Sequence, residues 1–300
     1  MQRIKGICTA IITPFDKNGD IDEEALRGHV DFLIESGVHN LYPCGTLGEG
    51  MSMNVDERKR VAQIIFDQAK GRVKVFVHVG ALRPQDAFEL AQHAEKIGAA
   101  GVGSVTPFYY GLTQKEMYEY FKDLANSVSD DFSVYAYNLP GNTTNDILPE
   151  TVLELSKTKN IVGIKNTMFD VSRISRLKNT LPEGFQVIIG EDIISLPAFA
   201  LGADGSVSGF SNMFPETFVK MYNHIQKNEI SEAALLQNKI NMYCQNWPCF
   251  KVSFLKDTLH MRGFKRSYCR APISKEASKE EYEYLLGIGR KAFKEEGFFG

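Results

Sequence analysis

The sequence lacks paired cysteines and long apolar runs. Its five cysteines are scattered, and none forms the C-x-x-C pair that binds zinc or carries out redox chemistry. We therefore expect reduced thiols in a cytoplasmic protein. No stretch reaches the roughly 18 apolar residues of a membrane span, and Pro14 and Asp16 interrupt the N-terminus before a signal-peptide core could form. We expect no membrane partner.

An excess of one charge is also missing. Thirty-four basic residues stand against 37 acidic ones, a formal net charge of −3, which gives no field that would attract nucleic acid. One local basic cluster, Lys265, Arg266 and Arg270, is too short to change this and is expected to be a solvated face. The six histidines show no H-x-H or H-E-x-x-H spacing, so we expect no metal site.

What the sequence does contain is a repeated unit: a short apolar run, a loop with glycine, proline or threonine, and an amphipathic segment that ends near a glycine. Most of the runs are continuously apolar, as in parallel strands covered on both faces. The eight runs are residues 7–12, 38–43, 73–79, 101–106, 132–138, 161–165, 186–190 and 204–209. They predict a closed (β/α)8 barrel. An open doubly wound sheet is the alternative, although no G-x-G-x-x-G follows a strand.

Beyond the eighth run the pattern is helical. The expected helices are 214–227, 230–246, 250–262 and 278–295. No linker interrupts the chain, so we interpret residues 1–227 as the catalytic barrel and residues 228–300 as a helical extension of the same domain.

Barrel enzymes carry their sites at the carboxyl ends of the strands, where Lys165 and Tyr137 fall. Alternation in IVGIKNT places Ile164 on one face and Lys165 on the other, so Lys165 points into the barrel if Ile164 packs on helices. Burial disfavours the lysine cation and favours a neutral amine that forms a Schiff base with a ketone. Two alternatives stay open: Lys165 paired with Glu191 or Asp192, and Tyr137 as a core aromatic.

A glycine-rich loop, G-T-L-G-E, follows the second run. Its glycines leave a series of backbone N–H groups open, which is a concavity suited to a carboxylate. Glu49 is expected to open the following helix, where its charge would meet the helix dipole.

Five motifs in order, G-T-L-G-E, V-T-P-F-Y-Y, Y-A-Y-N-L-P, V-G-I-K-N-T and L-G-A-D-G-S-V-S-G, resemble the N-acetylneuraminate lyase and dihydrodipicolinate synthase superfamily. The resemblance implies a homotetrameric barrel that carries out pyruvate-dependent class I aldol chemistry on a 2-oxo acid and an aldehyde. It implies no metal and no cofactor other than the covalent lysine–pyruvate imine.

The resemblance also implies roles for individual residues. Lys165 matches the Schiff-base lysine and Tyr137 the proton-transferring tyrosine. Thr46 matches the hydroxyl that relays protons to that tyrosine and helps to hold the pyruvate carboxylate. Tyr109 falls where a neighbouring subunit's tyrosine enters the relay. Leu47 stands where a second threonine is usual, so carboxylate binding is expected to depend more on backbone N–H groups.

The aldehyde half of the site departs from both well-known members. Asn142 replaces the arginine of the synthases, and Ile193 and Gly209 replace an acidic residue and a serine of the sialate lyases. We expect Asn142, Asp192 and Ser208 nearest the substrate hydroxyls. The other expected substrate-binding positions are Gly45, Thr46, Leu47, Glu191 and Gly209.

These observations lead us to expect a lyase that cleaves a 2-oxo-3-deoxy sugar acid, N-acetylneuraminate or a related compound, to pyruvate and an aldehyde. One alternative is 4-hydroxy-tetrahydrodipicolinate synthase, which condenses pyruvate with aspartate semialdehyde. Two further alternatives are a non-catalytic barrel that only binds pyruvate and a divalent-metal aldolase.

Overall fold

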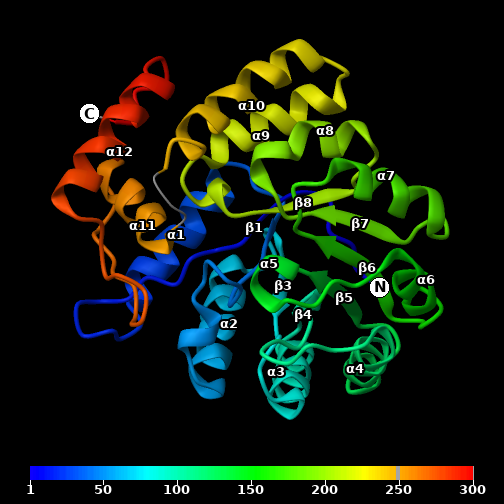
Figure 1. The fold of residues 1–300 in the computed structure, drawn as a ribbon. Helices are drawn as coiled ribbons and strands as arrows, with labels where there is room; N and C mark the ends of the chain where they lie inside the picture. Colours follow the sequence, from blue (N-terminus) through cyan, green and yellow to red (C-terminus); the bar gives the residue numbers. More distant parts are fainter. Residues whose placement is uncertain (248–250, 300) are drawn as a thin grey trace.

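The computed structural model describes residues 1–247 and 251–299. Within these ranges eight parallel strands pair in chain order, and the last pairs with the first, so that the sheet closes into a barrel. Figure 1 shows the strands at the centre with the helices around them. The predicted (β/α)8 barrel is confirmed, and the open sheet is wrong.

Each strand overlaps one of the eight predicted apolar runs. The strands are β1 Gly6–Thr9, β2 Asn40–Leu41, β3 Lys74–His78, β4 Gly101–Val105, β5 Ser133–Asn138, β6 Ile161–Asn166, β7 Gln186–Ile189 and β8 Gly205–Ser208. Most are shorter than predicted because the chain leaves the sheet at the barrel mouth. Ile12, for example, donates its N–H to the side chain of Asn212 instead of to a neighbouring strand (3.1 Å).

The barrel helices alternate with the strands, as the repeated unit predicts. They are α1 Glu23–Glu35, α2 Val55–Ala69, α3 Pro84–Lys96, α4 Gln114–Asn126, α5 Pro140–Thr143, α6 Pro149–Leu155, α7 Val171–Thr180, α8 Ser195–Ala200 and α9 Pro215–Gln226. Asp22 caps α1 by accepting from Ala25 N. Gly37 and Gly98 follow α1 and α3 with φ of 88°, a conformation that favours glycine.

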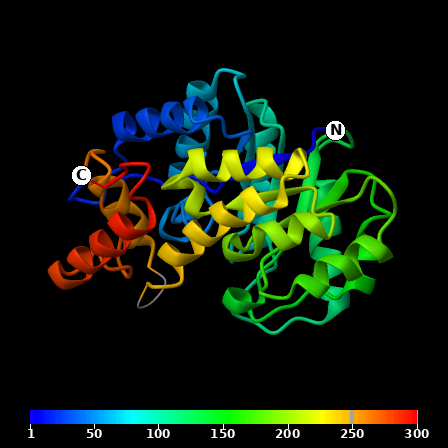
Figure 2. The same ribbon diagram turned by 90° about the horizontal axis from the view of Figure 1, so that it is seen from above.

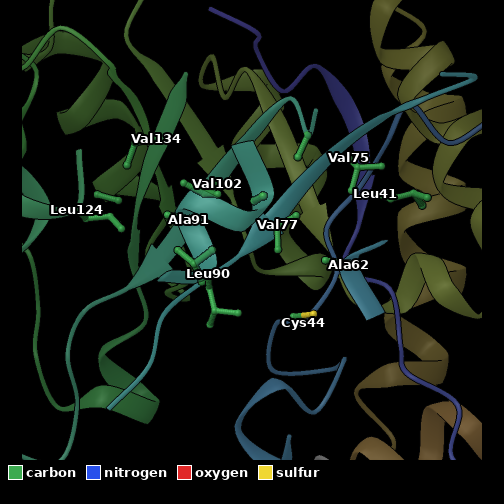
Figure 3. Packing of buried hydrophobic residues seen from close by; sticks show 14 of the residues in the cluster. Leu41, Cys44, Ala62, Val75, Val77, Leu90, Ala91, Val102, Leu124 and Val134 are labelled. Carbon is green, nitrogen blue, oxygen red and sulfur yellow. The ribbon is translucent and has the colours of Figure 1, made fainter. Parts of the chain in front are cut away.

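A buried apolar cluster joins the strands to the surrounding helices. Figure 3 shows part of it: Leu41, Val75, Val77, Val102 and Val134 lie in strands, and Ala62, Leu90, Ala91 and Leu124 lie in helices. Ile164 of β6 belongs to this cluster, as the alternation predicts. Lys165 therefore faces the barrel interior.

The C-terminal segment adds α10 Ile230–Cys244, α11 Val252–Met261 and α12 Lys279–Ala292. These helices match the predicted ones, although residue 250 lies outside the described part of the chain. A second buried cluster joins them to the barrel, because it contains Tyr42 and Tyr135 of the barrel together with Phe254 and Phe293 of the C-terminal segment. The division at residue 227 stays a prediction.

The chain that follows α11 returns to the start of the barrel. Tyr268 forms an antiparallel bridge with Phe15, and Figures 1 and 2 show this orange segment beside the blue β1–α1 connection. The expected solvated basic face is confirmed for Lys265, whose side chain is 61% exposed although it pairs with Asp22, but not for Arg270, which is 18% exposed and pairs with Glu57. Acidic groups from distant parts of the chain meet these cations, and local sequence does not reveal them.

The described cysteines, Cys8, Cys44, Cys244 and Cys269, are free and buried, as expected of reduced thiols, while Cys249 lies outside the described residues. Among the helices of residues 1–247 and 251–299, none is long and apolar enough to cross a membrane.

Candidate active site

Lys165 and Tyr137 lie side by side at the carboxyl ends of β6 and β5. They are register partners, and the Lys165 Nζ lies 3.8 Å from the centroid of the Tyr137 ring and 5.3 Å from that of Tyr42. Both side chains are buried, with 7% of Lys165 and 4% of Tyr137 exposed. In the described part of the chain no acid accepts from Nζ, so the alternative ion pair of Lys165 with Glu191 or Asp192 is not formed.

Gly190, which directly follows β7, makes room for this lysine. A Cβ at Gly190 would lie 2.8 Å from the Lys165 Cε and 1.9 Å from the Thr167 Oγ1. Only glycine lets the two side chains share this space. Thr167 was not among the residues chosen from the sequence, although it stands two positions after Lys165 and alternation assigns it to the same face. Its buried hydroxyl has no hydrogen-bond partner among the described residues.

Glu191 and Asp192 follow Gly190 and carry the perturbed carboxyl groups of the site. Burial raises the pKa of Glu191 to about 7, and the charge of Asp192 adds to the rise. Burial also raises the pKa of Asp192 to about 6. Asp192 Oδ2 accepts from the N–H groups of Gly209 (2.9 Å) and Phe210 (2.7 Å), whereas Oδ1 is buried and has no partner within the described chain. One oxygen of Asp192 therefore holds the turn after β8, and the other is available to a ligand.

The loop after β2 is tightly folded. A Cβ at Gly48 would lie 2.9 Å from the Ile11 carbonyl oxygen, and one at Gly50 would lie 1.9 Å from that of Cys44. Within the described residues no hydrogen bond is donated by the backbone N–H groups of residues 45–48. Four successive N–H groups are therefore free to donate to a ligand, as the expected carboxylate site requires. Thr46 is exposed on this loop and does not bond Tyr137.

Leu47 packs directly onto the backbone of Gly209. The Leu47 Cδ1 lies 2.2 Å from the position that a Gly209 Cβ would occupy. The two departures from the family pattern are thus complementary, because a serine at residue 209 would collide with this leucine. The contact places an apolar group between the loop after β2 and the turn after β8.

Other expected site residues lie away from Lys165 or have partners of their own. Ser208 is fully buried, its Oγ accepts from Ser211 N (3.0 Å), and its side chain hydrogen-bonds Asp192. Asn142 is exposed on α5. Tyr109 is 81% exposed, with φ of 81°, and its ring packs against Tyr110. None of the three contacts Lys165 within the described part of the chain.

Glu49 is the N-cap residue of a short 3-10 helix, Gly50–Ser52, but its side chain caps no N–H there, so the expectation that it opens the following α-helix is wrong. Helix α2 begins six residues later at Val55 and is capped by Asn54, whose side chain and that of Glu57 form a reciprocal capping box. Glu49 is instead buried against Lys256 of α11. The capping box explains why Glu49 is not needed at α2, because Asn54 and Glu57 accept from the backbone N–H groups at the start of that helix.

His78 and Tyr42 are interior residues that sequence reasoning did not single out. His78 packs edge-on against the Tyr137 ring (6.0 Å between centroids), and burial together with Arg58 and Lys165 holds its pKa well below the usual range. The Tyr42 hydroxyl has no partner among the described residues, and burial raises its pKa. Across residues 1–247 and 251–299 no group of three His, Cys, Asp or Glu side chains is arranged to hold a metal ion.

A closed (β/α)8 barrel with a buried, unpaired amine at the carboxyl end of β6 has the architecture of a Schiff-base aldolase. The chain belongs to the dihydrodipicolinate synthetase family, whose model matches residues 3–288.

Similar proteins support this assignment over nearly the whole chain. A 4-hydroxy-tetrahydrodipicolinate synthase of Chlorobium phaeobacteroides is 32% identical over 296 residues, which cover 94% of this chain and 97% of the relative. One from Syntrophus aciditrophicus is 37% identical over 236 residues, 79% of this chain and 80% of the relative.

Two solved structures show the same fold. A dihydrodipicolinate synthase from Bacillus anthracis has a TM-score of 0.92 at 29% identity, covering 97% of this chain and 99% of that one. A prophage protein of the dihydrodipicolinic acid synthase family from E. coli K12, in complex with pyruvate, has a TM-score of 0.90 at 27% identity, covering 96% and 98%.

Enzymes of this family are class I pyruvate-dependent carbon–carbon lyases that form a covalent imine between a lysine and pyruvate and use no external cofactor. The chain is an enzyme of this class. Family membership therefore favours the expected aldolase over the non-catalytic barrel and the metal-dependent aldolase.

Proposed function

We propose that Lys165 forms the imine with pyruvate. The observation that carries the proposal is the position of its Nζ, which is buried, free of any acidic partner among the described residues, and 3.8 Å from the Tyr137 ring centroid. The amine attacks C2 of pyruvate, and loss of water leaves the protonated imine. Loss of a C3 proton gives the enamine, which adds to an aldehyde. Tyr137 transfers the protons of these steps.

The loop after β2 receives the pyruvate carboxylate. The free N–H groups of residues 45–48 donate to it, and the exposed Thr46 hydroxyl adds a side-chain donor. Because Leu47 carries no hydroxyl, backbone donors carry most of this binding. Such fixed donors hold the carboxylate in one orientation, which directs C2 toward the amine.

For the second substrate we propose aspartate semialdehyde, so that the reaction is the condensation that forms 4-hydroxy-tetrahydrodipicolinate. The relatives carry this name over most of the chain, and they favour the alternative expected from the sequence over its main interpretation. Cleavage of a 2-oxo-3-deoxy sugar acid is the second candidate. It is favoured by Asn142 in place of arginine and by the unpartnered oxygens of Asp192 and Thr167, which suit substrate hydroxyl groups.

The active form that we propose is a cytoplasmic homotetramer in which Tyr109 enters the site of a neighbouring subunit. Its side chain is 81% exposed and makes no contact with Lys165 of its own chain, which leaves it free to contact a second copy.

A substrate panel decides between the two reactions. Pyruvate consumption with aspartate semialdehyde is measured beside pyruvate release from N-acetylneuraminate and from 2-oxo-3-deoxy hexonates and pentonates. We expect the highest kcat/KM for the semialdehyde, and a higher value for any sugar acid would contradict the proposal. The variant Asn142→Arg supplies the missing carboxylate partner and should raise kcat/KM for the semialdehyde by roughly tenfold.

A further inference from the structure

A buried ion pair joins the C-terminal segment to the loop that follows β2. Lys256 Nζ of α11 lies 2.5 Å from Glu49 Oε1, and the two side chains are 1% and 0% exposed. The ammonium also donates to the carbonyl oxygens of Thr13 (2.8 Å) and Tyr268 (2.6 Å). Glu49 Oε2 accepts from the backbone N–H of Arg270 (2.8 Å). Both charged groups are thus fully engaged, as a buried pair requires.

The loop held by this pair has a costly backbone conformation. Cys44 and Glu49 flank residues 45–48 and have φ of 62° and 52°, in the left-handed region that side chains other than glycine rarely adopt. Such residues persist only where the surrounding structure holds them. The four free N–H groups lie between these two residues, so their arrangement depends on what holds the ends of the loop.

Thr13 gives Lys256 a second connection to the same loop. Its carbonyl oxygen accepts from Lys256 Nζ, and its hydroxyl donates to the carbonyl oxygen of Gly48 (2.8 Å). Lys256 therefore reaches Glu49 directly and Gly48 through one intervening residue.

The segment after α11 holds the other side of the loop. Arg270 donates to the carbonyl oxygens of Gly19 (2.7 Å) and Ser52 (3.0 Å) and pairs with Glu57 of α2 (2.7 Å). Figures 1 and 2 show this orange segment against the blue start of the barrel. The C-terminal segment thus contacts the chain both before and after residues 45–48, which we call the carboxylate loop.

We propose that Lys256 and Glu49 are positioning residues, through which the C-terminal segment holds residues 45–48 in the conformation that binds the pyruvate carboxylate. This rests on the proposed function for its consequence, although not for its geometry. Neither residue is assigned a contact with pyruvate, and both act through the loop. A buried ion pair is weak evidence of stability but a recognised means of fixing one conformation. Here the conformation that it fixes is that of residues 45–48.

The test uses a double variant, Lys256→Met with Glu49→Gln, because Lys256→Met alone leaves a buried charge without its partner and risks unfolding. The control is Lys251→Met, which breaks the pair between Lys251 and Glu281 in the same segment, away from the loop. Two readouts are compared with the unaltered enzyme: the pyruvate concentration that gives half-maximal borohydride labelling, and amide hydrogen exchange in residues 45–49. Exchange in β5 is the internal reference.

In the double variant we expect the half-saturating pyruvate concentration to rise at least about tenfold. Maximal labelling should stay within about threefold of that of the unaltered enzyme. Exchange in the loop should rise at least about tenfold while β5 is unchanged. The Lys251→Met control should keep both values of the unaltered enzyme. Unchanged half-saturation in the double variant, or exchange that rises equally in β5, would overturn the positioning role. If the unaltered enzyme takes no label, the proposed function fails, and loop exchange alone then decides the positioning role.

Discussion

Two residues near the carboxyl ends of β6 and β7 carry buried oxygens without a partner among the described residues. Asp192 Oδ1 and Thr167 Oγ1 are buried and unbonded among the described residues, and Lys165 Nζ has no acidic partner there. Buried polar atoms are normally hydrogen-bonded, because an unmade bond costs about 1–3 kcal/mol. A ligand that supplies donors to these oxygens relieves that cost on binding, which explains why such atoms lie where substrate is proposed to bind.

The contact between Leu47 and Gly209 gives a prediction about stability. Gly209→Ser places a Cβ 2.2 Å from the Leu47 Cδ1 and should lower the free energy of unfolding by about 1–3 kcal/mol through overpacking. Adding Leu47→Ala removes the collision and should restore about half of the loss or more. Urea unfolding of both single variants and the double variant measures the coupling. Strictly additive effects would contradict the contact.

Glu191 gives a prediction about pH. Its folded pKa of about 7 lies above the ordinary value of 4.5, so the folded protein binds this proton more tightly than the unfolded chain. Stability should therefore fall as the pH rises from 4.5 to about 7. Glu191→Gln removes this loss and keeps Asp192 and Lys165, so the variant should gain stability relative to the unaltered protein between pH 5 and pH 7.5. A pH-independent difference in unfolding free energy would contradict the assignment.

Among the elements, the loop after β2 depends on its glycines. Gly50→Ala places a Cβ 1.9 Å from the Cys44 carbonyl oxygen, whereas Gly111→Ala meets nothing within 4 Å and is the matched control. We expect Gly50→Ala to raise the pyruvate KM at least about tenfold, since displaced N–H groups lose the carboxylate. Gly111→Ala should keep the KM of the unaltered enzyme. Equal KM values for the two variants would show that the loop does not bind pyruvate.

Local sequence was sufficient for most of the elements. Continuous apolar runs mark all eight β/α units, glycines follow several of the helices, and alternation around Ile164 correctly predicts that Lys165 faces inward. Contacts between distant residues were not predictable. Glu49 and Lys256 are 207 positions apart, so no periodicity connects them, and Glu49 was assigned to the nearest helix. Leu47 and Gly209 could each be recognised as a departure from the family pattern, but their contact is visible only in the folded chain.

At the scale of the whole molecule, the exposed Tyr109 predicts that assembly and catalysis are linked. We expect sedimentation equilibrium to give four chain masses. Tyr109→Phe keeps the ring and removes the hydroxyl, so it should preserve the assembly and slow imine formation at least about tenfold. A tetrameric variant with an unchanged rate would remove Tyr109 from the proton relay.

The central claim is that the amine of Lys165 forms the imine with pyruvate, and peptide mass spectrometry after borohydride reduction tests it most directly. In the presence of pyruvate we expect one irreversible mass increment on the peptide that carries Lys165, and none after the same treatment of Lys165→Met. An unmodified Lys165 peptide, or an increment carried by another lysine, would contradict the account.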